Sequence, residues 1–339
     1  MDIHFQNGER YQVIAASVLE TLETEIRNFV SSSRINDFQR WIVDDLYCFT
    51  PPEADFSIES ILLVAVPHPF YSEVTFQHHQ RRYHCVSLVR SDFERTRNTL
   101  KRELSTGKFS VLEVESLPLK RLAVQSALAV YGRNNITYIP EFGSNFSYIA
   151  FYSDLPPAVS SLSPVQVSTR CETCRACMRV CPTGAIQADA FLIDNERCLS
   201  YLNESSGPFP DWLPVSAHHT LYDCIQCQKY CPLNVDQKNN TGRRIEFSEA
   251  ETDILLAGAS FDDYPKGLKE KSLYLGMDQW PDGIAKNHCA VVLRRTMDPA
   301  STHVERPARY PQLDSGRRVR GGYAKRHAEP LLRCSRCCC

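Results

Sequence analysis

The chain has 339 residues, of which 43% are hydrophobic and 23% are charged, as expected for a globular protein that can bury a core. Its 38 Lys and Arg residues nearly balance 40 Asp and Glu residues, so the chain as a whole is not built to bind polyanions. The N-terminus lacks a basic stretch followed by an apolar run, and no apolar stretch approaches the roughly 18 residues of a membrane helix. We therefore expect a cytoplasmic protein without a membrane segment, and we expect it to be a monomer.

Residues 1–155 are expected to form a mixed α/β domain. Apolar positions at helical spacing predict helices over 12–31, 90–108 and 117–132, the last with Pro118 in its first turn and Gly132 at its end. Short apolar or alternating runs predict strands over 61–67, 109–116, 136–140 and 145–155, with a turn at 141–144.

The composition changes twice after this domain. Residues 156–240 are expected to form a cysteine-rich module, and its first segment, 156–170, is rich in Pro and Ser, which suits a linker. Short helices are predicted over 246–258 and 283–295, within a helical segment at 241–299. Residues 300–339 are poor in large apolar side chains and rich in Arg and Lys, so we expect a disordered basic tail.

The module contains two cysteine runs. The first, "CETCRACMRVCP", begins at Cys171 and has the C-x2-C-x2-C-x3-C-P spacing of bacterial ferredoxins. The second, "CIQCQKYCP", begins at Cys224 and lacks one cysteine of the same motif. In this spacing three thiolates bind one 4Fe–4S cube, and the cysteine before the proline binds the other cube. The sequence therefore predicts two 4Fe–4S clusters.

The crossover rule divides the cysteines into two sets of four. The first cysteine set is Cys171, Cys174, Cys177 and Cys231. The second cysteine set needs one residue beyond Cys181, Cys224 and Cys227, and Cys198 is the only other cysteine between the runs. The alternative is a pair of zinc sites. A zinc site usually takes its four ligands from two C-x2-C pairs, often with histidine. The adjacent cysteines of the C-x2-C-x2-C-x3-C-P run would then have to bind two different zinc ions.

The quoted runs, together with "ERCLSYLNE" at 196–204, resemble the epoxyqueuosine reductase family. The stretch from Val114 to Pro156 is similar to that family too, in its acidic residue, proline, helix, Gly-Ser and aromatic strand. The resemblance covers about residues 55–240, and in the family the lone cysteine before Ser-Tyr-Leu, here Cys198, is the eighth cluster ligand.

The resemblance implies a cobalamin enzyme related in fold to reductive dehalogenases. The corrinoid would lie between the α/β domain and the ferredoxin module, and flavodoxin or ferredoxin would donate electrons through both clusters to the cobalt. In that family an epoxide oxygen leaves as water and an alkene remains, which takes two electrons and two protons. The implied fold class is α+β: a corrinoid-binding-like α/β domain, a ferredoxin-like module with two 4Fe–4S clusters, and a short helical or disordered C-terminus.

The resemblance also suggests site residues. The family places an aspartate three positions before its proline as proton donor, and Glu115 holds that position before Pro118 on a stem one methylene longer. The loops "YGRNN" and "FGSNF" match those that surround the corrinoid, which implies contacts from Asn134, Asn135, Gly143 and Ser144.

Three interpretations remain open on the sequence. The first is a cobalamin-dependent iron–sulfur reductase with an unknown substrate, and the second is a cobalamin-free electron carrier. The third is a shortened tRNA epoxyqueuosine reductase, because long family members carry a C-terminal helical-repeat region that grips tRNA and this sequence shows at most two short helices there.

Overall fold

The computed structural model describes residues 3–5, 8–33, 35–107, 109–114, 116–188, 191–205 and 208–279. The helix predicted over 283–295 and the tail predicted over 300–339 lie outside the described residues. Within the described residues no helix has both the length and the apolar character needed to span a membrane.

The largest sheet has four strands in the order β1–β2–β8–β5, each antiparallel to its neighbours. These strands are β1 (Arg10–Ala15), β2 (Ser60–Pro67), β5 (Val111–Glu113) and β8 (Phe146–Ser153). The strands predicted over 61–67 and 145–155 are thereby confirmed, whereas the one over 109–116 is limited to three residues. The mixed α/β character expected of this half of the chain is present.

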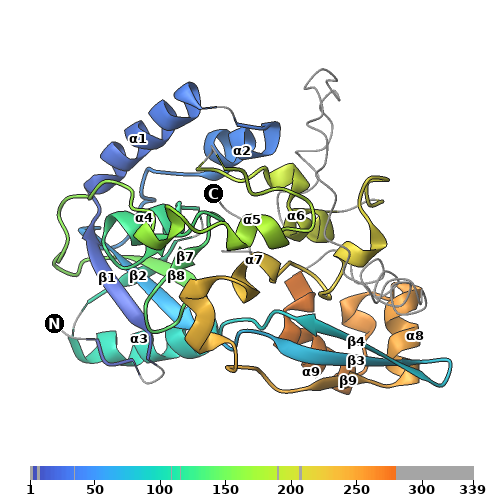
Figure 1. Ribbon diagram of the computed structural model, residues 1–339. Coiled ribbons are helices and arrows are strands. Elements are labelled where there is room, and N and C mark those ends of the chain that lie inside the picture. Colours follow the sequence, from blue (N-terminus) through green and yellow to red (C-terminus); the bar gives the residue numbers. More distant parts are fainter. Residues whose placement is uncertain are drawn as a thin grey trace.

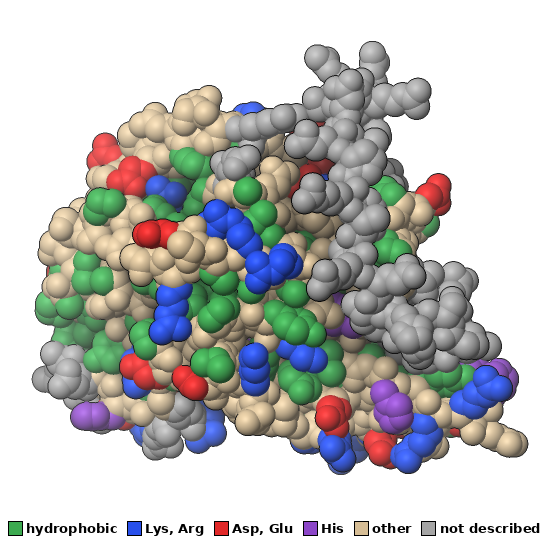
Figure 2. Space-filling view, viewed as in Figure 1, with side chains coloured by type: hydrophobic (Ala, Val, Ile, Leu, Met, Phe, Trp, Pro, Cys, Tyr) green, Lys and Arg blue, Asp and Glu red, His purple; other side chains and the backbone are tan. Residues whose placement is uncertain are grey.

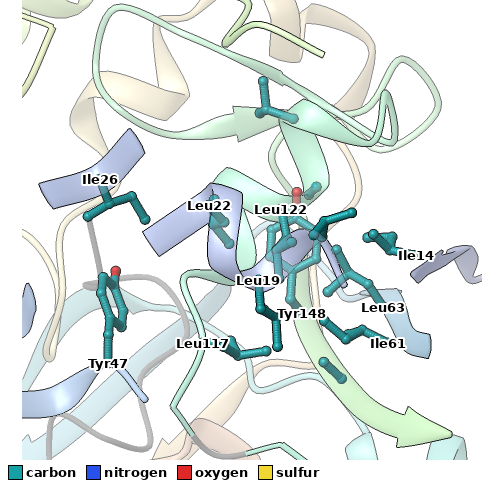
Figure 3. Close-up of a cluster of buried hydrophobic side chains, with 14 of the residues drawn as sticks. Ile14, Leu19, Leu22, Ile26, Tyr47, Ile61, Leu63, Leu117, Leu122 and Tyr148 are labelled. Atoms are coloured by element: carbon teal, nitrogen blue, oxygen red, sulfur yellow. The ribbon is translucent and has the colours of Figure 1, made fainter. Parts of the chain in front are cut away.

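Helices cover both faces of this sheet (Figure 1). One face carries α1 (Val18–Ser32), α2 (Asp37–Trp41) and α4 (Leu119–Gln125). Helix α2 continues as a π-helical turn over Ile42–Leu46. The other face carries α3 (Phe93–Gly107). Alternate residues of β2 point to opposite faces, so Leu63 packs with α1 and α4 while Leu62 packs with Leu100 of α3. Figure 3 shows the first of these cores, to which Leu19 and Leu22 of α1 and Ile61 and Leu63 of β2 contribute.

Two of the predicted helices are partly wrong. Residues 12–15 belong to β1, because their main chain pairs with β2, and the helix begins only at Val18. The helix predicted over 117–132 ends at Gln125, and Ala127 has a φ of 61° in the left-handed region. The chain then enters β6 (Val130–Tyr131), which pairs with β7 (Thr137–Tyr138) in the strand-like segment expected at 136–140.

The Pro- and Ser-rich segment at 156–170 is fastened to the α/β domain. The main-chain N–H groups of Ala158 and Val159 donate to the carbonyl of Val13, at 2.9 and 3.0 Å. Farther on, the N–H of Ser168 donates to the carbonyl of Tyr131 at 2.8 Å. These bonds fix the position at which the first cysteine run begins.

A second, smaller sheet joins segments from before and after the cysteine module. Strand β3 (Ser72–His78) pairs antiparallel with β4 (Arg81–Ser87) and parallel with β9 (Ile245–Phe247). Helices α8 (Glu249–Ala257) and α9 (Lys266–Leu275) share a core with this sheet (Figure 1). The helix predicted over 246–258 corresponds to α8, whereas the hairpin and α9 were not predicted.

The cysteine module lies between these two parts and consists of short helices joined by loops (Figure 1). Its helices are α5 (Ala176–Val180), α6 (Leu199–Glu204) and α7 (Gln226–Lys229), with 3-10 turns at Thr169–Cys171, Asn195–Arg197, Val215–Ala217 and Pro232–Gln237. Each cysteine run therefore enters a short helix, which brings nearby thiols to the same side of the chain.

Candidate functional site: two cysteine-lined cavities

A cavity lies between the loop after β6 and the two cysteine runs. A 4Fe–4S cube has four iron atoms, each of which takes one thiolate ligand. All four cysteines that spacing assigned to the first cysteine set line this one cavity: Cys171, Cys174, Cys177 and Cys231. The cavity thus has the donor set that a cube requires.

A second cavity lies between the module and the α/β domain. Its wall contains the whole second cysteine set, Cys181, Cys198, Cys224 and Cys227. The remaining wall is largely apolar and includes Phe38, Ile136 and Ile193. This cavity has the donor set for a second cube, and its wall extends beyond the cysteines to residues of the α/β domain.

The zinc alternative requires ligands that converge on a single ion. In the described part of the chain, no three His, Cys, Asp or Glu side chains form such a group. Each cysteine set instead surrounds a cavity, as a multi-atom cluster requires. Two cavities that each carry four cysteines are the arrangement expected for two 4Fe–4S clusters.

Burial raises the pKa of some of the thiols in each cysteine set. Burial, with a contribution from nearby Cys231, raises the pKa of Cys177 to about 11. Burial and the proximity of Cys181 raise the pKa of Cys198 to about 12. Because iron binds the thiolate, cluster assembly must displace these protons, and the positive iron offsets the buried negative charge.

Asp223 connects the two segments that supply the second cysteine set. Its backbone has a φ of 62°, a left-handed conformation that Asp tolerates better than most residues. One carboxylate oxygen accepts hydrogen bonds from the N–H of Cys224, at 2.9 Å, and from the hydroxyl of Ser200. Asn203 on α6 donates to the Asp223 carbonyl at 2.8 Å. Asp223 thereby positions Cys224 against the helix that follows Cys198.

Asn134 and Asn135, predicted from the resemblance, both lie at the second cavity. The carbonyl of Asn135 accepts a hydrogen bond from Lys120 of α4 at 3.3 Å. The backbone of Asn135 is left-handed, with a φ of 58°. Its Nδ2 is buried and has no hydrogen-bond partner among the described residues. A buried amide donor without a partner is costly, which suits a site that receives an acceptor-bearing group.

Gly143 and Ser144 contact the cysteine module directly. The N–H of Ser144 donates to Oδ1 of Asn234 at 2.8 Å, and its hydroxyl donates to Oε1 of Gln228 at 2.7 Å. Gly143 has a φ of 60°, and a Cβ there would overlap the Asn234 amide. This loop thus holds the second cysteine run against the α/β domain; the corrinoid contacts predicted for these two residues stay a prediction.

Glu115 lies outside the described residues, so its predicted role as proton donor stays a prediction. Three side chains around the cavities were not predicted as site residues. Lys120 is buried and lines the second cavity, Tyr138 is buried at β7, and Asp223 precedes Cys224. In the sequence, Lys120 is a lysine within a predicted amphipathic helix, and Asp223 is an acidic residue before a cysteine. Exposed residues with no role in a site often occur at such positions, so neither pattern identifies a site residue.

Comparison with known proteins bears directly on the cysteine module. Residues 170–234 match the family described as "4Fe-4S double cluster binding domain". This match contains both cysteine runs and Cys198, so the prediction of two 4Fe–4S clusters is confirmed at the level of the domain.

Several curated relatives are epoxyqueuosine reductases. The one from Alicycliphilus denitrificans is 37% identical over 131 residues, which is 38% of this chain and 33% of the relative. The one from Vibrio cholerae is 28% identical over 255 residues, 73% of this chain and 61% of the relative. The chain therefore spans between about a third and three fifths of the length of these relatives.

Solved structures agree on the fold. The epoxyqueuosine reductase of Bacillus subtilis gives a TM-score of 0.56 at 17% identity, covering 86% of this chain and 79% of that one. An epoxyqueuosine reductase with an epoxyqueuosine-modified tRNA-Tyr stem loop gives 0.55 at 17% identity, over the same shares. The chain is thus similar in sequence and fold to epoxyqueuosine reductases, and its residues 170–234 match a 4Fe-4S double cluster binding domain.

Proposed function

We propose that this chain is an iron–sulfur reductase that passes electrons through two 4Fe–4S clusters to a cobalamin held in the second cavity. The observation that carries the proposal is the second cavity itself. It has the four cysteines that a cube needs, and it continues past them to α4 and the loop after β6. A purely electron-carrying ferredoxin needs no such space behind its cluster.

Residues on the α/β side of the cavity suit a corrinoid. Asn135 offers a buried N–H donor without a partner, and Lys120 lines the same wall. The corrin ring is rimmed by amide groups, which accept such hydrogen bonds, and its apolar ring faces match Phe38 and Ile136. Bound cobalamin would supply a reduced cobalt centre, which is chemistry that side chains do not provide.

We propose epoxyqueuosine in tRNA as the substrate. The named relatives are epoxyqueuosine reductases, and one solved neighbour holds an epoxyqueuosine-modified tRNA stem loop. The reaction breaks both epoxide C–O bonds, leaves an alkene and releases the oxygen as water, with two electrons from the clusters and two protons. Glu115 is our candidate for one proton; the Bacillus subtilis structure is described as having a catalytic aspartate loop swung out of its active site.

The electron donor is proposed to be a flavodoxin or ferredoxin that meets a monomer of this chain at the cysteine module. Arg170, Arg179 and Lys229 are exposed on the segments that carry the cysteine runs. Figure 2 shows Lys and Arg side chains distributed over the face on which α5 and α7 lie. Positive charge there would attract an acidic carrier and bring its cofactor close to the first cluster.

The proposal is tested by anaerobic purification with added hydroxocobalamin. A corrinoid absorption spectrum at about one per chain, retained after desalting, is the expected result. Protein with both clusters and no corrinoid would instead indicate an electron carrier. For the substrate, tRNA from a strain that lacks this protein should retain epoxyqueuosine, and normal queuosine in that strain would exclude epoxyqueuosine as its target.

A further inference from the structure

One arginine of the α/β domain lines the first cavity. Arg133 lies in the loop after β6, and its main-chain N–H donates to Sγ of Cys171 at 3.4 Å. The thiolate form of a cysteine that binds iron carries negative charge and accepts such a bond more strongly than a neutral thiol does. The first cysteine set is thus bonded to the α/β domain through a ligand sulfur.

The guanidinium of Arg133 holds two segments of the cysteine module. Its Nη2 donates to the carbonyl of Cys171, and its Nη1 donates to the carbonyl of Ala188 at 3.0 Å. Cys171 opens the first cysteine run, and Ala188 lies beyond the end of that run. These two bonds fix the guanidinium beside the cysteine whose sulfur accepts from the main chain of the same residue.

The remaining nitrogen of the guanidinium, Nε, is a buried donor without a hydrogen-bond partner among the described residues. Such a donor is costly, which suits a site that receives a group able to accept a hydrogen bond. All four cysteines of the first set line the same cavity as Arg133, and a 4Fe–4S cube there would bring sulfur atoms that accept. The free donor therefore indicates an acceptor-bearing group in the first cavity.

The main chain around Arg133 forms a closed turn between β6 and β7. The N–H of Gly132 donates to the carbonyl of Ile136 at 2.7 Å, and the N–H of Asn135 donates to the carbonyl of Gly132 at 3.0 Å. The paired strands hold both ends of this turn. The contact between Arg133 and Cys171 is therefore set by the fold of the main chain and does not depend on a side-chain rotamer.

The two cavities differ in the charged side chains that line them. Among the described residues that line the first cavity, Arg133 and Arg170 are cationic and none is an Asp or Glu. The second cavity is lined by Lys120 and Asp223, whose charges are opposite. Arg170 is exposed, so water and salt screen its charge, whereas Arg133 is half-buried. Arg133 is therefore the main fixed positive charge at the first cavity.

We propose that Arg133 is a positioning residue that raises the reduction potential of the first 4Fe–4S cluster above that of the second. The proposal rests on the clusters and ligand sets of the proposed function. The cluster takes up one electron from the reduced carrier, which is oxidised by one electron, and no bond to iron forms or breaks. The guanidinium and the N–H that donates to Cys171 stabilise the added negative charge, so they favour the reduced state over the oxidised state.

The test is an anaerobic redox titration of the reconstituted full chain, followed by electron paramagnetic resonance. Cys198→Ala, which retains only the first cluster, assigns the signal of that cluster. Arg133→Met keeps the main-chain N–H and removes the charge, so it should lower the reduced-to-oxidised ratio of the first cluster about tenfold at a fixed solution potential. Tenfold corresponds to about 59 mV in a one-electron couple. Arg133→Lys keeps the charge and should bring this ratio back to within about threefold of the wild-type value.

The matched control is Arg197→Met, which removes the same charge from the same module. Arg197 is also half-buried, but its Nε donates to the carbonyl of Thr183 at 3.2 Å, its guanidinium lies 4.6 Å from the centre of the Trp212 ring, and it does not line the first cavity. The potential of the first cluster should therefore stay at the wild-type value. A wild-type potential in Arg133→Met with both clusters present would overturn the inference and leave the proposed function intact. Wild-type protein that assembles no clusters would overturn both.

A second measurement uses the wild-type chain and applies if Arg133→Met fails to assemble its first cluster. Protein that carries a nitrogen isotope label only in arginine is reduced stepwise and studied by pulsed electron paramagnetic resonance. The bond from the N–H of Arg133 to Cys171 predicts coupling of labelled nitrogen to the first cluster, and this cluster should be reduced at a higher potential than the second. A first cluster without this coupling, or one that is reduced only after the second, would refute the inference.

Discussion

The contact between Gly143 and Asn234 gives a sharp prediction about how the second cysteine run is held. In Gly143→Ala the new methyl group would overlap the Asn234 amide, which is fully buried. Asn234 would have to leave Ser144 and the carbonyl of Gln228, to which its Nδ2 donates at 2.8 and 3.0 Å. Because the N–H of Asn234 donates to the carbonyl of Cys231 at 3.0 Å, its movement would disturb a ligand of the first cluster.

The size of the effect follows from two contributions. A left-handed backbone costs a non-glycine residue about 1 kcal/mol or somewhat more. Three hydrogen bonds of Asn234, at about 1 kcal/mol each, are then lost or weakened in a buried site. We expect Gly143→Ala to lower the free energy of unfolding by about 4 kcal/mol. Gly8→Ala is the matched control, because Gly8 has a φ of 77° but nothing within 4 Å of the new Cβ, so only the backbone cost of about 1 kcal/mol applies.

Both variants should be compared by anaerobic urea unfolding, followed by circular dichroism, and by iron analysis of the folded protein. Gly143→Ala should unfold at lower urea and lose iron from the first cluster, whereas Gly8→Ala should keep its iron. Equal destabilisation of the two variants would show that the Asn234 contact does not anchor the module.

Three further variants test the site. Cys198→Ala should lower iron toward half of about eight per chain and leave one intact cluster; unchanged iron would refute the second cysteine set. Glu115→Gln should retain clusters and corrinoid but slow turnover by about 10²–10⁴-fold, as for loss of a general acid; unchanged turnover would return Glu115 to an ordinary surface residue. Asn135→Asp keeps a residue that tolerates the left-handed backbone but replaces the N–H donor with an acceptor, so corrinoid retention after desalting should fall while iron stays constant. Full corrinoid retention in Asn135→Asp would remove Asn135 from the proposed cofactor contacts.

The grouping of cysteines could be predicted because cluster spacing is a local property of the chain. Two residues between ligands place their thiols on one side of a tight turn, and α5 and α7 provide such turns. Even Cys198, which lies in neither run, was found by counting donors. Those same two groups of four line the two cavities.

Long-range contacts were beyond the sequence. The segment Val13–Ala15 fits a helical pattern as well as a strand, and only its pairing with β2 decides between them. The hairpin β3–β4 finds its partner β9 more than 150 residues later in the chain, across the whole cysteine module. The same holds for Asn134, which lines both cavities beside cysteines of both runs only in the folded protein.

The central claim is that eight cysteines hold two 4Fe–4S clusters in this chain, and low-temperature electron paramagnetic resonance of the anaerobically reconstituted, dithionite-reduced protein tests it most directly. We predict about eight irons per chain and spectra of two reduced cubes that interact magnetically because they lie close together. Protein that binds zinc instead, or that shows the signal of a single isolated cube at full iron loading, would contradict the claim.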